Sequence, residues 1–218
     1  MKKFLSVALI FLVMCVSGCG NKNTAEQPVS ETEKNIAKII AEKKDAPVKV
    51  SIPKITRAEA NAKLSELSAG LNVRVDDMKE LTFCHCPIDY DAHPPISIAP
   101  YVTLDKNYNV DLYQDIVYVG REVLYFDTLY IKTSSGVDTF HYEKTVKSID
   151  GGYVGEEYVG KMTDGLYRKL KSAIKEGGAK FRFEGRVFAE RNFTGKELSD
   201  MAKVFAIYEF FKGVKVIN

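Results

Sequence analysis

The side chains best suited to metal binding or redox chemistry lie between residues 83 and 93, where the chain reads FCHCPIDYDAH. Two cysteines, two of the chain's three histidines and two aspartates fall within it. Thiolate, imidazole and carboxylate groups are the side-chain ligands of zinc and copper. One hypothesis is therefore a zinc or copper site formed by Cys84, His85, Cys86 and His93.

The Cys-x-Cys spacing permits two other interpretations. It is tighter than the Cys-x₂₋₄-Cys spacing of zinc loops, and in a strand Cys84 and Cys86 would share one face while His85 points to the other. The two cysteines could instead form a disulfide or redox pair outside the cytoplasm, although so short a loop strains disulfide geometry. The third interpretation is incidental packing of the two thiols, and the sequence favours it.

Composition and motifs exclude several classes of function. The chain carries 31 lysine and arginine residues against 29 aspartate and glutamate residues and has no basic cluster, which argues against a nucleic-acid partner. The sequences GxSxG, HExxH and CxxC are absent. A spatially assembled active site leaves no such trace, but the sequence itself favours a protein that is not an enzyme.

The first residues have the organisation of a secretory signal peptide. Lys2 and Lys3 precede an apolar run, residues 4–16, which is too short for a permanent membrane-spanning helix. Val16-Ser17-Gly18-Cys19 then resembles the lipobox of bacterial lipoproteins. The resemblance implies that residues 1–18 are removed and that Cys19 becomes a lipidated N-terminus.

This resemblance also implies where the protein is located. Two or three acyl chains hold a protein firmly on a membrane, because each buried CH₂ contributes about 0.8 kcal/mol. The mature chain would sit on a membrane surface of the cell envelope, outside the cytoplasm. Gly20 stands where an aspartate would resemble an inner-membrane retention signal, which favours the outer membrane in a bacterium that has two.

Residues 19–55 are expected to form the lipidated N-terminus and a flexible tether. Residues 20–30 are polar, and residues 31–44 carry a thin isoleucine stripe that could form a helix. A single folded domain is expected over residues 56–218. Thr56 and Glu59 have the spacing of a capping box that opens its first helix.

From Leu81 onward, apolar residues recur at every second position, which indicates strands. The expected strands are residues 81–86, 98–104, 110–119, 123–133, 137–144 and 179–184. Ser134-Ser135-Gly136 marks a hairpin, and helices are expected over 165–176, capped by Asp164, and from a second capping box at Thr194 to about Phe211. We therefore predict an α+β fold, in which an N-terminal helix and two C-terminal helices pack on an antiparallel, aromatic-rich sheet, with a sandwich as one possible arrangement.

The predicted sheet resembles small uncharacterised domains of bacterial lipoproteins, in which a threonine-capped helix leads into an aromatic-rich sheet. That resemblance lends no residue roles. Aromatic residues such as Tyr101 and Tyr113 favour a pleated, half-buried surface, and such a row could instead line a groove for a carbohydrate or a peptide.

Residues 150–165 contain five glycines but lack the spacing of nucleotide-binding motifs. An irregular loop or a bulged strand is expected there. Glu156 and Glu157 would point to opposite faces of an extended segment, which argues against a paired acid–base role and favours solvated charges.

We expect a lipid-anchored binding or structural module that contacts the membrane through its anchor and an envelope protein or glycan through its folded domain. The alternative is a metal-binding or thiol-redox envelope protein that uses Cys84, His85, Cys86 and His93.

Overall fold

Twelve strands and three helices make up the part of the chain that the computed structural model describes, residues 51–88, 95–143 and 145–217. The helices are α2 (Arg57–Leu67), α3 (Asp164–Glu176) and α4 (Gly195–Lys212). The strands are β1 (Lys54–Thr56), β2 (Asn72–Asp76), β3 (Leu81–His85), β4 (Ile96–Asp105), β5 (Val110–Gly120), β6 (Thr128–Thr133), β7 (Gly136–His141), β8 (Val146–Asp150), β9 (Tyr153–Lys161), β10 (Lys180–Glu184), β11 (Phe188–Asn192) and β12 (Lys215–Ile217). The α+β prediction is confirmed.

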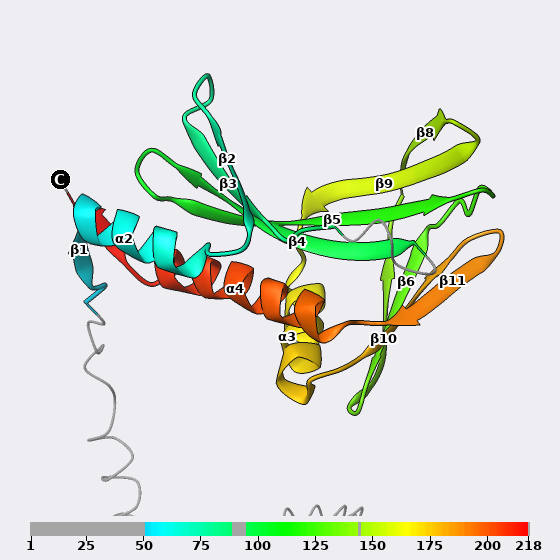
Figure 1. Ribbon diagram of the computed structural model, residues 1–218. Helices are drawn as coiled ribbons and strands as arrows, with labels where there is room; N and C mark the ends of the chain where they lie inside the picture. Colours follow the sequence, from blue (N-terminus) through cyan, green and yellow to red (C-terminus); the bar gives the residue numbers. More distant parts are fainter. Residues whose placement is uncertain (1–50, 89–94, 144, 218) are drawn as a thin grey trace, which may run out of the picture. The chain divides into compact units, whose positions relative to one another are not determined.

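Two antiparallel sheets dominate the fold. The larger has the order β2-β3-β4-β5-β9-β8, and the smaller has the order β11-β10-β6-β7. Strands β1 and β12 form a short parallel pair, which brings the start of the described chain beside its end. In Figure 1 the three helices lie below the larger sheet, and the β2–β3 and β8–β9 hairpins rise from it.

Threonine caps start all three described helices. Thr56 and Glu59 form a reciprocal capping box at α2, and Thr194 and Glu197 form a second one at α4, as the sequence predicts. The cap of α3 is Thr163 instead of the expected Asp164, because the Thr163 hydroxyl accepts a hydrogen bond from the N–H of Leu166, the third residue of the helix.

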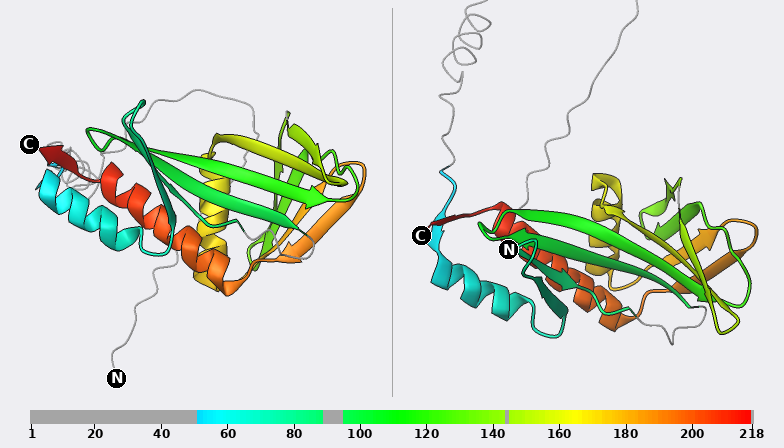
Figure 2. Two further views of the ribbon diagram at one scale, coloured as in Figure 1. Left: turned by 45° about the horizontal axis from the view of Figure 1, so that its top comes forward. Right: turned by 90° about the horizontal axis from the view of Figure 1, so that it is seen from above.

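The core is one cluster of buried side chains from the larger sheet, the smaller sheet and the helices. Helix α4 packs against β4 and β5, and the views of Figure 2 show it running beneath the sheet. Residues paired directly across strands share a face, so Ile98 and Ile116 mark one face and Ala99 and Asp115 the other. We call the first the inner face, because its apolar residues form the buried core, and the second the outer face.

The expected strand 123–133 is wrong in its first half. Residues 123–127 form a loop in which Tyr125 has φ 52°, and β6 begins only at Thr128. The N–H groups of Tyr125 and Phe126 donate to the Glu156 carboxylate at 2.7 and 3.1 Å. These bonds replace the ladder bonds of a strand.

The glycine-rich segment is more regular than expected. It holds the β8–β9 hairpin, whose turn is Gly151-Gly152 with φ 55° and 80°, values that glycine adopts without strain. Glu156 is fully buried on the inner face, so its description as a solvated charge is also wrong. The prediction that Glu156 and Glu157 point to opposite faces is confirmed.

Candidate functional site

The Cys-His-Cys stretch is divided between the two faces of the sheet. Cys84 pairs with Val102 on the inner face, and Cys86 is buried there as well. His85 pairs with Tyr101 on the outer face. Both cysteines are free, and burial raises the pKa of Cys84 to about 11 and that of Cys86 further still, so both favour the neutral thiol.

The described residues contain no group of three or more histidine, cysteine, aspartate and glutamate side chains that could hold a metal ion. His93 lies outside them, so the zinc or copper site with all four residues stays a prediction. His85 and Cys86 do border one pocket of about 400 Å³, with Asn72, Val73, Arg74 and Ile88.

A row of stacked rings crosses the outer face. The His85 ring lies 4.0 Å from that of Tyr101 with a 9° interplanar angle, and the Tyr101 ring lies 5.1 Å from that of Tyr113 with a 12° angle. Arg74 lies over Phe83, beside His85, at one end of the row, and Lys161 lies 5.8 Å from the Tyr113 ring at the other.

This stacking limits what the row can bind. A planar sugar-binding platform needs an exposed ring face, but these rings turn their faces to one another and to the flanking cations. Burial also lowers the pKa of His85, with Arg74 adding to the effect, so this ring favours its neutral form. The row therefore provides a rigid, edge-on apolar surface.

Beside the row lies a carboxyl group with an unusual environment. Asp115 is in the middle of β5, pairs with Ala99 on one side and Val159 on the other, and is only 7% exposed. Among the described residues, its Oδ1 is the one buried side-chain nitrogen or oxygen without a hydrogen-bond partner. Such an atom loses its hydration without compensation, which costs about 1–3 kcal/mol or more for a charged group.

Glu157 is a charged neighbour of Asp115 on the adjacent strand. It lies on β9 opposite Val117, on the outer face, and is exposed. Burial raises the pKa of Asp115 to about 7, and the charge of Glu157 and a hydrogen bond between the two carboxyl groups add to this effect. Asp115 therefore titrates near neutral pH instead of in the acidic range of an ordinary aspartate.

The charges of Asp115 and Glu157 also affect the pKa of Tyr101. Burial raises the pKa of Tyr101 to about 12, with smaller contributions from Tyr113, Asp115 and Glu157. The nearby cation Lys161 is already paired with Asp111, at 3.1 Å. Asp115 therefore has a field of negative and neutral groups around it and no partner of opposite charge.

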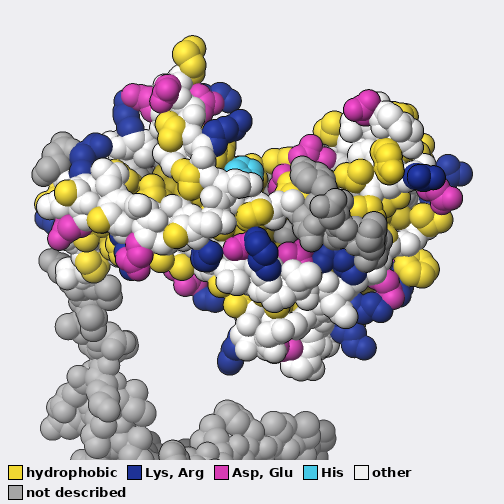
Figure 3. Space-filling view, viewed as in Figure 1, with side chains coloured by type: hydrophobic (Ala, Val, Ile, Leu, Met, Phe, Trp, Pro, Cys, Tyr) yellow, Lys and Arg dark blue, Asp and Glu magenta, His cyan; other side chains and the backbone are white. Residues whose placement is uncertain are grey.

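Figure 3 shows this side of the molecule as a surface. The surface is hollowed between the β2–β3 hairpin and the β8–β9 hairpin, and acidic side chains reach it in the hollow. On the outer face, Asp115 and Glu157 offer two neighbouring carboxyl groups as acceptors, and the rings of Tyr101 and Tyr113 lie beside them.

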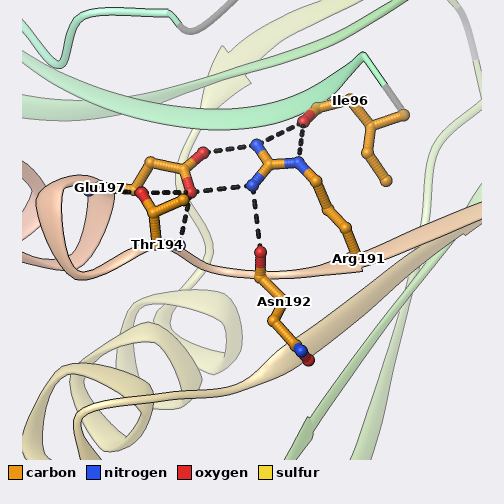
Figure 4. A network of polar contacts seen from close by, with 5 residues as sticks. All are labelled: Ile96, Arg191, Asn192, Thr194 and Glu197. Atoms are coloured by element: carbon orange, nitrogen blue, oxygen red, sulfur yellow. Dashed lines mark hydrogen bonds and ion pairs between the residues drawn. The ribbon is translucent and has the colours of Figure 1, made fainter. Parts of the chain in front are cut away.

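Elsewhere, a buried carboxylate has all the partners it needs. Glu197, 9% exposed, accepts from both Nη atoms of Arg191, and the Arg191 guanidinium also donates to the carbonyl oxygen of Ile96 at 2.6 and 2.9 Å. Figure 4 shows this network, in which Glu197 also accepts from the Thr194 N–H. It joins β4, β11 and the start of α4 and has a structural role.

Sequence reasoning missed Asp115. It stands in LYQDIVYV, a run in which apolar residues occupy both strand faces around it. A charged residue at the centre of such a run is a signal for a buried carboxyl group, because a strand that is apolar on both faces is covered on both.

No protein-family model, curated protein or solved structure matches this chain. Within the described part of the chain, no helix is long and apolar enough to cross a membrane.

Proposed function

We propose that this chain is a lipoprotein of the bacterial cell envelope that binds an envelope partner through the outer face of its larger sheet and catalyses no reaction. Lipids on Cys19 anchor it, and residues 20–50 link the anchor to the folded domain. Two independent features support the two parts of this proposal, the Val16-Ser17-Gly18-Cys19 sequence and the environment of Asp115.

The unpartnered Oδ1 of Asp115 is the observation that carries the binding role. Native proteins satisfy nearly all buried polar atoms, and exceptions gather at sites where a ligand completes the set. The rest of the outer face supports binding rather than catalysis. Its thiol neighbours Cys84 and Cys86 are on the other face and neutral, and burial raises the pKa of Tyr101 away from the range of a base at pH 7.

The anchor is tested by labelling cells with a radioactive palmitate precursor and separating membranes from soluble protein. The full chain should take up label and sediment with membranes, whereas Cys19→Ala should do neither. Label that persists in Cys19→Ala would contradict the anchor.

The binding face is tested with a photoreactive amino acid in the full chain. Val159, exposed on the outer face beside Asp115, receives it in one variant, and Lys175, exposed on α3, receives it in the control. We expect one dominant adduct in the envelope from position 159 and none from position 175. Equal or absent adducts at both positions would contradict this face as the binding surface.

A further inference from the structure

The geometry points to the Asp115–Glu157 pair as a binding site for a protonated primary amine. This inference deepens the proposed function and rests on it, because it names the chemical group that the outer face recognises. The amine could belong to a small molecule or to a lysine side chain of a partner protein, and the chemistry of recognition is the same.

The charges of the site select a cation. Two carboxyl groups, on adjacent strands and with one buried oxygen free, attract positive charge and repel anions. The groups that face Asp115 from the surrounding strands are Tyr101 on β4, Tyr113 on β5, and Glu157 and Lys161 on β9. Of these, Lys161 is the one cation, and Asp111 holds it.

The number of acceptors argues for an ammonium group over a metal ion. Divalent metals take a larger set of ligands, and calcium takes six to eight oxygens, whereas the described part of this site offers two carboxyl groups and no third acidic group. An ammonium group needs only two or three acceptors, and the unpartnered Oδ1 of Asp115 together with the Glu157 carboxylate supplies them.

The space around Asp115 favours a compact cation over a planar one. Asp115 is 7% exposed, and its direct cross-strand neighbours are Ala99, fully buried, and Val159. A guanidinium group needs room for a planar fork with parallel bonds, whereas an ammonium group is a small sphere on a thin stem. Glu157 is exposed, so the cation reaches the pair from its Glu157 side.

The ring edges beside the pair suit the stem of such an amine. An alkyl chain packs against apolar surface while its charged end is held elsewhere. Tyr113 is on β5, the strand that carries Asp115, and Tyr101 is on the adjacent strand β4. Their stacked rings form a rigid apolar surface. The site therefore takes a primary ammonium on an aliphatic chain.

The experiment uses the full chain purified in detergent, with n-butylammonium chloride as the probe. Carbon NMR of the aspartate carboxyl groups follows the titration of Asp115 with and without the amine. Saturating amine should lower the pKa of Asp115 from about 7 by about one unit or more, because the cation binds the ionised pair. The apparent affinity should be about tenfold weaker at pH 6 than at pH 8, a range in which the amine itself stays protonated.

Three variants locate the effect. Asp115→Asn should weaken amine binding by at least about tenfold, and Glu157→Gln should weaken it by a smaller factor. Glu122→Gln removes an exposed carboxylate outside the pair and should leave the affinity within about twofold. A thermal unfolding curve for each variant shows that it is folded.

Two peptides, and methylguanidinium as a second cation, complete the test. Acetyl-Gly-Lys-Gly-amide should bind at least as well as butylammonium if the amine comes from a partner protein, and better binding of butylammonium assigns the site to small amines. Either result supports the inference. The same peptide with Nε-acetyl-lysine should not bind.

Three results would overturn the inference. They are an Asp115 pKa that saturating amine does not move, binding that survives Asp115→Asn, and equal affinity for methylguanidinium. If the amine fails while position 159 still gives its adduct, the outer face binds a partner by other chemistry and the proposed function stands. If the amine does not bind and position 159 gives no adduct, both the amine site and the proposed binding face are wrong.

Discussion

Glu197 and Asp115 are buried to nearly the same degree, with exposed fractions of 9% and 7%, but their surroundings are opposite. Although burial opposes ionisation of Glu197, hydrogen bonds from Arg191 and from Thr194 hold its pKa below the usual range. Burial raises the pKa of Asp115 to about 7, and the neighbouring carboxyl group of Glu157 adds to the rise where a cation would oppose it. Burial alone therefore does not decide the state of a carboxyl group. The donors placed around it do.

The comparison separates a region with a structural role from the region that we propose binds a partner. A buried ion pair with all its hydrogen bonds satisfied ties three elements together at the junction of β4, β11 and α4. The outer face instead keeps a carboxyl group that destabilises the folded chain when ionised. A site that is costly to the isolated chain and complete only with a ligand is the physical signature of binding.

Arg191→Ala should have the largest effect. It leaves Glu197 buried without its counter-charge and the Ile96 carbonyl without its donor, so we expect a loss of about 3–5 kcal/mol in the free energy of unfolding. Urea denaturation at pH 7 measures it. Arg182→Ala is the matched control, because Arg182 pairs with Glu190 in a half-exposed position and should cost less than about 1 kcal/mol. Similar losses in both variants would erase the distinction between the two regions.

Asp115→Asn should act in the opposite direction. The pKa of Asp115 is raised on folding, so its contribution is fully present below its ordinary value of 3.8 and is lost as the pH rises through about 7. At pH 8 the variant should therefore be more stable than the native chain, by at most about 4 kcal/mol, and at pH 4 most of this difference should be gone. The midpoints of urea denaturation at both pH values measure this, and a variant that is less stable at pH 8 contradicts it.

Thr194→Ala should have a smaller effect within the Arg191–Glu197 network. The variant loses the hydroxyl that accepts from the Glu197 N–H at 3.2 Å and caps α4, which costs about 1 kcal/mol. The backbone N–H of residue 194 still donates to Glu197, so the ion pair is kept. Thermal unfolding measures the loss, and Thr194→Ser, which retains the hydroxyl, should restore most of it.

Glu157→Gln should change stability least, by less than about 0.5 kcal/mol, because Glu157 is exposed. Its effect should appear instead in the pKa of Asp115, which should fall once the neighbouring charge is removed. Carbon NMR of the Asp115 carboxyl group follows this shift. Glu122→Gln, which removes another exposed glutamate, should leave the Asp115 pKa unchanged.

Local signals in the sequence predicted much of the fold. The capping boxes at Thr56 and Thr194 depend on residues three positions apart, and the Ser134-Ser135 hairpin depends on adjacent strands, so both are visible without the structure. Strand β2 was not predicted, although its sequence NVRVD alternates between polar and apolar residues; it is a short edge strand in which Asn72, Val73, Arg74 and Val75 are all exposed.

The candidate site was less predictable for a physical reason. Glu157 and Asp115 are far apart in the chain, and their meeting depends on the register of β5 against β9. The alternation of Glu156 and Glu157 was predicted from the strand period, but that period does not say which of the two faces is the core. The sequence therefore could not show that Glu156 is the buried carboxylate and that Glu157 is beside Asp115.

The Arg191 bond to Ile96 also has a kinetic consequence. It joins residues separated by 95 positions, so the chain must close a long loop before the bond can form. Contacts of this kind form late in folding, and removing them mainly accelerates unfolding rather than slowing folding. The network at the start of α4 therefore sets how long the folded chain survives before it opens.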